Sequence, residues 1–327
     1  MSRFDYLLEK IQQAPFETVP FRHVYITDFL TAEDFKAIVQ SPEINIPPAK
    51  DDDDLFDTLD SKGYKIIEFP GCITDRQDYI DWHKTGKTKR FHSSACEGFG
   101  VTLRLYGPET PILNELIEFL SGDAFNRVMA EKFGLDYENC NVDNGIQKYL
   151  DGYEISPHPD IRRKAATFMV NINPHEGSEA LDHHTHYLNL KGEHSRVREF
   201  WDENLETERC WVPWDWCDVV KTQPENNSIV LFAPANDTMH AVRANYDHLA
   251  GQRTQLYGNL WHKDVGDLPP HDWELFELER GKLSWGGLKL KLRENLPDPV
   301  LAMARKVLGS DDRARKQAAT NLGERTY

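Results

Sequence analysis

Apolar residues in the first part of the chain recur mainly at the spacing of helices. Residues 111–134, PILNELIEFLSGDAFNRVMAEKFG, are the clearest case and predict one or two amphipathic helices. A short strand and then a helix are expected within 24–41, where Thr31 and Asp34 have the spacing of a capping box. The run DDDDLFD at 51–57 carries like charges and predicts a solvated loop.

From residue 140 the pattern changes to short runs of β-branched and aromatic residues, separated by Gly, Pro, Asn and Asp. The runs are NGIQKYL, AATFMVNI, THYLNL, NSIVLFAP and TQLYGNLW. Because no helices alternate with them, we predict an antiparallel double sheet of the jelly-roll type with flanking helices, a mainly β (α+β) fold class. We expect one elaborated domain over 1–327, with N-terminal helices and strands in 1–139, the β core in 140–265, an insert at 175–224 and a helical extension at 266–327.

Composition limits the partners that the protein can have. Hydrophobic residues make up 39% of the chain, enough for a packed core, and the net charge of −16 argues against binding to nucleic acid or an anionic membrane. The five cysteines form no CxxC pair, so we expect reduced, buried thiols in a cytoplasmic protein. The N-terminal MSRFDYLLEKIQQ lacks the apolar core of a signal peptide, and no apolar run approaches the about 18 residues of a membrane span. Composition leaves the oligomeric state open.

The triplet His158-Pro159-Asp160 is the first candidate for chemistry. In a strand its histidine and aspartate point to the same face, and the proline favours a strand end or edge. An imidazole and a carboxylate suit a divalent metal such as Fe(II). A third ligand, His240, follows a buried run at 228–232 and a turn. Two histidines and one carboxylate make the facial triad that leaves one side of a metal open.

An arginine follows at the start of the next strand. In that strand, alternate residues share a face: Arg253, Gln255, Tyr257, Asn259 and Trp261. The planar guanidinium is the natural partner of a carboxylate, because it binds both oxygens at once. Arg243 is the competing candidate, but its odd spacing from His240 places it on the opposite face of a continuing strand.

The ordered set Tyr149-x-x-Gly152, His158-x-Asp160, His240 and Arg253 resembles the 2-oxoglutarate- and Fe(II)-dependent dioxygenases, most of all their prolyl-hydroxylase-like branch. The resemblance covers about residues 140–262. It implies a double-stranded β-helix (jelly roll, cupin-like) core. It also implies that the two histidines and the aspartate hold Fe(2+), that Arg253 binds the cosubstrate 2-oxoglutarate, and that O2 is the oxidant.

Further residues enter through the same resemblance. Family members often carry a hydroxyl in the strand after the triplet to support the cosubstrate carboxylate, and Thr167 occupies that place here. Tyr149 resembles the tyrosine that reaches the cosubstrate. Asn171 shares the face of Thr167 and is a weaker candidate for the same role.

The implied activity is hydroxylation of an unactivated C–H bond in a small polar metabolite or saccharide, with release of succinate and CO2. Asp160 favours hydroxylation, because the family's halogenases have a small residue at its place; desaturation and ring closure stay open. A protein or peptide hydroxylase of the prolyl type is the close alternative. A cupin-like metal protein that is not an oxygenase, and a jelly-roll binding module without catalysis, are the others.

Two parts of the expected insert have open roles. Its four tryptophans form either a satellite core beneath a long loop or a wall of the substrate site: Trp201, Trp211, Trp214 and Trp216. The segment DHHTHYL resembles a metal site, but no second cluster pairs with its histidines, so we expect a solvated or substrate-facing loop.

Overall fold

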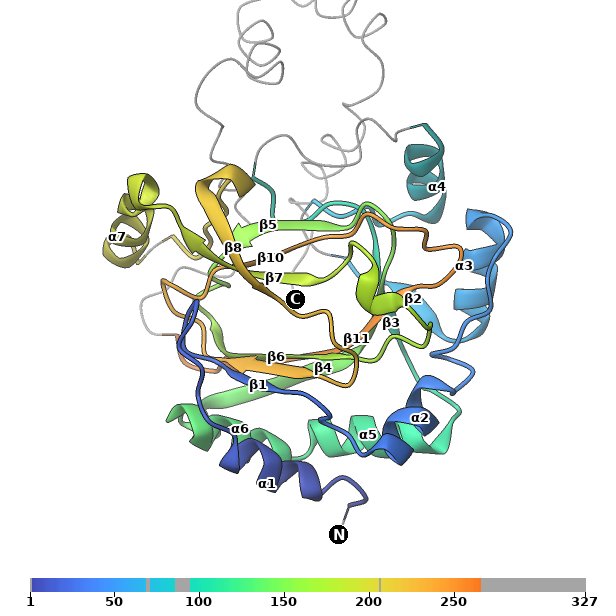
Figure 1. Ribbon diagram of the computed structural model, residues 1–327, viewed down its shortest axis with the longest axis horizontal. Helices are drawn as coiled ribbons and strands as arrows, with labels where there is room; N and C mark the ends of the chain where they lie inside the picture. Colours follow the sequence, from blue (N-terminus) through green and yellow to red (C-terminus); the bar gives the residue numbers. More distant parts are fainter. Residues whose placement is uncertain (1, 69–70, 86–94, 206, 266–327) are drawn as a thin grey trace, which may run out of the picture.

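The computed structural model describes residues 2–68, 71–85, 95–205 and 207–265. The β sandwich lies at the centre, with helices below it and at its sides (Figure 1). The expected helical extension at 266–327 lies outside the described residues. Among the described helices, none is both long and apolar enough to span a bilayer.

Eight strands form two facing antiparallel sheets. They are β4 (Cys140–Tyr149), β5 (Glu154–His158), β6 (Lys164–Asn171), β7 (Thr185–Leu190), β8 (Cys217–Thr222), β9 (Ile229–Phe232), β10 (His240–Arg243) and β11 (Arg253–His262). Four of them pair in the order β9-β6-β11-β4, and the other four form the second sheet in the order β5-β10-β7-β8. Successive strands alternate between the sheets, except for β7 and β8, which pair within the second sheet; this is the double-stranded β-helix that the resemblance implied. The mainly β fold class is confirmed.

Three earlier strands widen the first sheet to seven strands: β1 (Val24–Ile26), β2 (Tyr64–Ile66) and β3 (Thr102–Leu105). β1 pairs with β9 at one edge, and β3 pairs with β4 at the other, with β2 outside it. These additions make the first sheet the broad floor of the site, whereas the second sheet keeps four strands.

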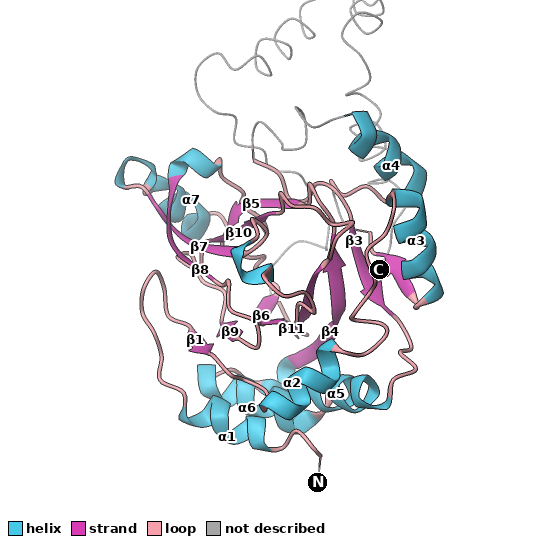
Figure 2. Ribbon diagram, turned by 45° about the vertical axis from the view of Figure 1, so that its right-hand side comes forward, coloured by secondary structure: helices cyan, strands magenta, loops and turns pink. Residues whose placement is uncertain are grey.

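Four helices cover the outer face of the seven-stranded sheet: α1 (Tyr6–Gln13), α2 (Ala32–Val39), α5 (Pro111–Ser121) and α6 (Asp123–Phe133) (Figure 2). The helix prediction for 111–134 is confirmed as two helices separated at Gly122. Thr31 caps the helix as expected, since its Oγ1 accepts from the Asp34 amide at 3.1 Å, but the box is incomplete because the Thr31 amide donates to the Tyr6 hydroxyl. Leu256 and Leu260 of β11 belong to the apolar core that these helices share with the sheet.

The remaining helices flank the sandwich. They are α3 (Asp52–Ser61), α4 (Arg76–Thr85), α7 (Arg196–Glu203) and the short 3-10 turns η1 (Tyr137–Asn139), η2 (Ser178–Ala180), η3 (Gly192–His194) and η4 (Trp214–Trp216). The loop predicted at 51–57 is wrong, because Asp51 caps α3 by accepting from the Asp54 amide at 2.9 Å. Acidic side chains in a first helical turn are stabilised by the helix dipole, and Asp52 is buried there against two histidines.

The range expected as an insert, 175–224, contributes β7 and β8 to the smaller sheet. What is added to the sandwich is therefore the connection between them, which carries η3, α7 and η4. Three of its four tryptophans pack in a satellite core around Leu188, Val212 and Met239: Trp201, Trp214 and Trp216. This supports the satellite-core interpretation for most of the segment.

Candidate active site

Backbone pairing brings the two histidines of the predicted triad together. His158 ends β5, His240 begins β10, and the two residues are direct partners across these antiparallel strands. Their rings lie 4.2 Å apart between centroids. Each Nδ1 lies within hydrogen-bond distance of a backbone carbonyl, that of Ser156 at 2.8 Å and that of Thr238 at 2.9 Å. A carbonyl only accepts, so both Nδ1 atoms carry the proton and both Nε2 atoms are free to bind a metal.

Asp160 completes the group just beyond the end of β5. Its φ of 79° lies in the left-handed region, which is uncommon for residues with a side chain but which aspartate and asparagine adopt more readily than others. Its two carboxylate oxygens lie 3.9 Å from His158 Nε2 and 3.9 Å from His240 Nε2. One donor atom from each of the three residues falls within 4.8 Å of the others.

The protonation states suit a metal. Burial lowers the pKa of His158 to about 3, and burial also lowers the pKa of His240, so both rings are neutral at physiological pH. Burial works against ionisation of Asp160, but the adjacent Lys164 ammonium overrides it and holds the pKa of Asp160 well below its usual range. Two neutral imidazoles and one carboxylate fit a divalent ion such as Fe(II) and leave coordination positions open.

Arg253 lies at the other end of the same interior. Its side chain is only 3% exposed, its Nη2 donates to Thr185 Oγ1 at 2.9 Å, and its guanidinium stands 4.5 Å from the centre of the Tyr149 ring. No carboxylate among the described residues lies within 4.0 Å of it, and the side chains around it include tyrosines whose pKa values are raised by burial, so they are neutral. Burial accordingly lowers the pKa of Arg253. A buried guanidinium without an anion is the state expected of a ligand-binding group.

Arg243, the competing candidate, is paired with a carboxylate of the protein. Arg243 Nη2 donates to the fully buried Glu154 at 2.6 Å, and its guanidinium lies 4.7 Å from the centre of the Trp214 ring. It is absent from the residues that line the interior cavity. Alternation predicted that Arg253 faces the site and that Arg243 faces away from it, and the structure agrees.

The expectation for Thr167 needs correction. Its hydroxyl donates to Asp160 Oδ2 at 2.8 Å instead of supporting a carboxylate beside Arg253. The reason is register: Thr167 pairs with Asn259, far along β11 from Arg253. The hydroxyl that does contact Arg253 belongs to Thr185 at the start of β7, in the opposite sheet.

The two remaining candidates lie nearer to the arginine. Tyr149 is opposite Arg253 in the β4–β11 register, and its hydroxyl donates to Gln147 at 2.5 Å. Asn171 accepts from Gln255 at 2.8 Å and donates to two backbone carbonyls, so its amide is engaged within the sheet. Tyr149 lines the cavity and Asn171 does not.

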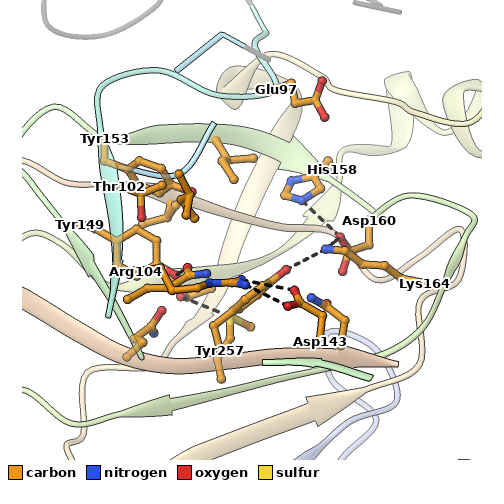
Figure 3. Close-up of a pocket in the computed structure, with 18 of the residues that line it drawn as sticks. Glu97, Thr102, Arg104, Asp143, Tyr149, Tyr153, His158, Asp160, Lys164 and Tyr257 are labelled. Carbon is orange, nitrogen blue, oxygen red and sulfur yellow. Dashed lines mark hydrogen bonds and ion pairs between the residues drawn. The ribbon is translucent and has the colours of Figure 1, made fainter. Parts of the chain in front are cut away.

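His158, Asp160 and Arg253 line one cavity of about 730 Å³ between the sheets (Figure 3), and His240 stands behind the first two, with its Nε2 3.9 Å from Asp160. The predicted inward face of β11 is confirmed, since each of its alternate residues lines the cavity: Arg253, Gln255, Tyr257, Asn259 and Trp261. Of the four tryptophans in the 175–224 range, Trp211 alone reaches the cavity wall. His183, from the histidine-rich segment, is buried against the ring of Tyr246, so the loop expected there is not solvated at this residue.

Two residues of the site were missed, Lys164 beside Asp160 and Thr185 beside Arg253. Lys164 Nζ donates to Asp160 Oδ1 at 2.5 Å and to the Tyr257 hydroxyl at 2.8 Å. Strict alternation would put Lys164 and Thr167 on opposite faces of β6, but the β6–β11 register shifts at this point, so both reach Asp160. Thr185 comes from the facing sheet, and no spacing along the chain relates it to Arg253.

No protein-family model and no curated protein matches the chain. Solved structures do. A Trichoplax adhaerens prolyl hydroxylase, in complex with a hypoxia inducible factor oxygen degradation domain peptide fragment, matches with 12% identity and a TM-score of 0.38, over 80% of this chain and 89% of that one. A Pseudomonas putida prolyl-4-hydroxylase matches with 11% identity and a TM-score of 0.40, over 79% and 99%. EvdO2 from Micromonospora carbonacea var. aurantiaca, complexed with 2-oxoglutarate, matches with 14% identity and a TM-score of 0.30, over 67% and 94%.

At these identities and TM-scores the likeness assigns no role to any residue. The chemistry of this chain is therefore decided by its own donor atoms, their protonation states and the cavity that they share.

Proposed function

We propose that the protein is a 2-oxoglutarate- and Fe(II)-dependent oxygenase that hydroxylates an unactivated C–H bond of a small polar metabolite or saccharide, with release of succinate and CO2. One observation carries the proposal. In a buried cluster of two histidines and one aspartate, His158 and Asp160 line the same cavity as a buried arginine that no carboxylate of the described residues neutralises. A metal site explains the first group, and a dicarboxylate cosubstrate explains the second.

Each of these residues has a definable task. The backbone carbonyls at Ser156 and Thr238 fix the tautomers of His158 and His240, so that both Nε2 atoms face the metal position. The Thr167 hydroxyl orients Asp160 by donating to one of its oxygens. Bound iron would supply the activation of O2, a reaction that no side chain performs.

Arg253 is the group that would orient 2-oxoglutarate. Its planar fork is suited to the distal carboxylate, and the hydroxyl of Thr185 beside it offers a further polar contact. The Tyr149 ring packs on the guanidinium and keeps water away from it, which strengthens an ion pair formed there. Cosubstrate bound between the arginine and the metal would then be held at both ends.

The cavity favours a small substrate over a folded protein. Its volume of about 730 Å³ lies within the range of about 300–1,000 Å³ that small-ligand pockets occupy. The lining mixes aromatic and apolar side chains with a few polar groups, as in Tyr153, Ile155 and Trp211 beside Glu97. A polar metabolite or a sugar ring needs such a mixture of flat apolar surface and hydrogen-bonding groups.

The test starts without oxygen. Anaerobic protein is mixed with Fe(II) and 2-oxoglutarate, and the weak visible charge-transfer band of the chelate is recorded. We expect the band in the wild type and its loss in His158→Ala and in His240→Ala, while Arg243→Met keeps it. Admission of O2 with a panel of small metabolites, saccharides and prolyl peptides then shows which class releases succinate. A wild type that binds the metal but gives no band, or a band that survives both histidine variants, would contradict the proposal.

A further inference from the structure

The cavity contains a second buried cation that the proposed reaction does not use. Lys164 lies close to the metal ligands, its side chain is 11% exposed, and its ammonium contacts Asp160 and the Tyr257 hydroxyl. In Figure 3 its nitrogen lies between Asp160 and Tyr257, two of the residues that line the cavity. A lysine that only decorated a surface would extend its nitrogen into water.

Two other charged side chains that line the cavity have ion partners of their own. Arg104 is paired with Asp143, at 2.9 Å, and Glu97 with Arg209, at 2.6 Å. Glu68 is solvent-exposed, so water and salt screen its charge.

The proposed ligands neutralise the rest. A divalent iron, the Asp160 carboxylate, the Arg253 guanidinium and a doubly charged 2-oxoglutarate together carry no net charge. The ammonium of Lys164 is then the largely buried charge left without a counter-ion among the described residues that line the cavity, whereas Glu68 is exposed to solvent. A carboxylate bound to a divalent ion also offers less negative charge to a neighbouring lysine than a free one.

The surroundings of Lys164 are those of a binding subsite. Its Nζ lies 5.5 Å from the centre of the Tyr257 ring and 5.7 Å from that of Trp261, and both rings line the cavity. The Tyr257 hydroxyl accepts from Lys164 and so can turn its own proton toward a ligand. A flat apolar wall, an ammonium and a hydroxyl donor in one place match a ligand that carries an anionic group on an apolar frame.

We propose that Lys164 and the Tyr257 hydroxyl form a subsite for an anionic group, a carboxylate or a phosphate, of the substrate. The subsite rests on the proposed function, because 2-oxoglutarate at Arg253 accounts for the other cation. It narrows the substrate from polar metabolites in general to anionic ones. The acidic surface, with a net charge of −16, does not attract such a molecule, so selection falls to this buried contact.

Binding of matched probes tests the subsite without turnover. Protein loaded with Zn(II) and 2-oxoglutarate is titrated with para-trifluoromethyl phenylacetate and with its neutral amide, followed by fluorine NMR; para-trifluoromethylphenyl phosphate is the second anionic arm. We expect at least one anionic probe to bind roughly tenfold or more tightly than the amide, the size of one charge-assisted hydrogen bond. The stronger of the two anionic probes identifies the group as carboxylate or phosphate.

Three variants complete the design. Lys164→Gln should abolish the preference for the anion, and Lys164→Arg should keep it. The matched control is Lys221→Gln, because Lys221 also contacts a carboxylate, that of Glu17 at 2.7 Å, and a tyrosine ring, that of Tyr25, yet lies outside the cavity. It should bind the probes as the wild type does.

The outcomes separate the two proposals. If the wild type forms no Fe(II)–2-oxoglutarate band, the proposed function is wrong. If the band forms but anion and amide bind equally, or neither binds, the subsite is wrong. The subsite is also wrong if Lys164→Gln weakens the band and the metal affinity while the preference for the anion persists. In that case Lys164 positions Asp160 and does nothing more.

Discussion

Replacing Arg253 by methionine should make the ligand-free protein more stable and its complex with 2-oxoglutarate weaker. In the free protein the guanidinium is 3% exposed and has no carboxylate partner among the described residues. Replacing even a complete buried ion pair by apolar side chains of similar volume is often neutral or stabilising by about 1–4 kcal/mol, and Arg253 has no ion partner to offset its desolvation. We therefore expect Arg253→Met to unfold at an equal or higher temperature than the wild type when no ligand is present.

The effect reverses when cosubstrate is added. In the wild type, 2-oxoglutarate at a hundred times its Kd, with Zn(II) in the metal site, should stabilise the folded state by about 2.7 kcal/mol. Loss of a buried, hydrogen-bonded charge partner costs about 2–5 kcal/mol of binding, a factor of roughly 30 or more in Kd. At the same 2-oxoglutarate concentration the variant should then gain less than about 1 kcal/mol.

Thermal and urea unfolding with and without 2-oxoglutarate measure both effects. Arg243→Met is the control, because that arginine is paired with the buried Glu154. The control should lose stability without ligand and should retain the full stabilisation by 2-oxoglutarate. The reasoning is refuted if Arg253→Met is clearly less stable than the wild type in the ligand-free state and is stabilised by 2-oxoglutarate to the same extent.

Three further variants test other parts of the site and fold. Thr167→Val removes the hydrogen bond to Asp160 and should weaken metal binding about 10–100-fold in a competition titration; unchanged affinity would deny Thr167 this role. Asp160→Gly should stop hydroxylation, and continued product formation would show that Asp160 is not a metal ligand. Burial opposes protonation of His83, but hydrogen bonds to Asp151 and Asp52 raise its pKa to about 9, above the ordinary value of about 6.5. Its stabilisation is therefore complete below about pH 6.5 and is lost as the pH rises through about 9, so the deficit in Tm of His83→Gln should shrink over that range; a deficit independent of pH would show that the ring acts only by packing.

Part of the site follows from local spacing, where the related residues lie within or next to one strand. His158 and Asp160 are two residues apart, and the face of β11 that contains Arg253 follows from alternation. Relations that depend on pairing between distant segments could not be predicted in this way. Thr185 meets Arg253 across the two sheets, and Lys164 reaches Asp160 only because the register of β6 shifts.

In the fold, too, local patterns were predictable and contacts between distant segments were not. The strand runs after residue 140 and the two helices in 111–134 were predictable, because a half-buried strand or helix leaves its period in the sequence. The acidic run at 51–57 was not, since its charges suit both a solvated loop and a first helical turn. What decides is tertiary: Asp52 is buried against His83 and His248, at 3.1 and 2.9 Å. The charge pattern of the sequence does not indicate that these two histidines contact Asp52.

The most direct test of the central claim is a crystal structure of the protein with Mn(II) and 2-oxoglutarate, with the metal located by its anomalous scattering. We predict one metal bound by His158 Nε2, His240 Nε2 and a carboxylate oxygen of Asp160, with the cosubstrate between that metal and the guanidinium of Arg253. A metal bound elsewhere, or a dicarboxylate that makes no contact with Arg253, would contradict the account.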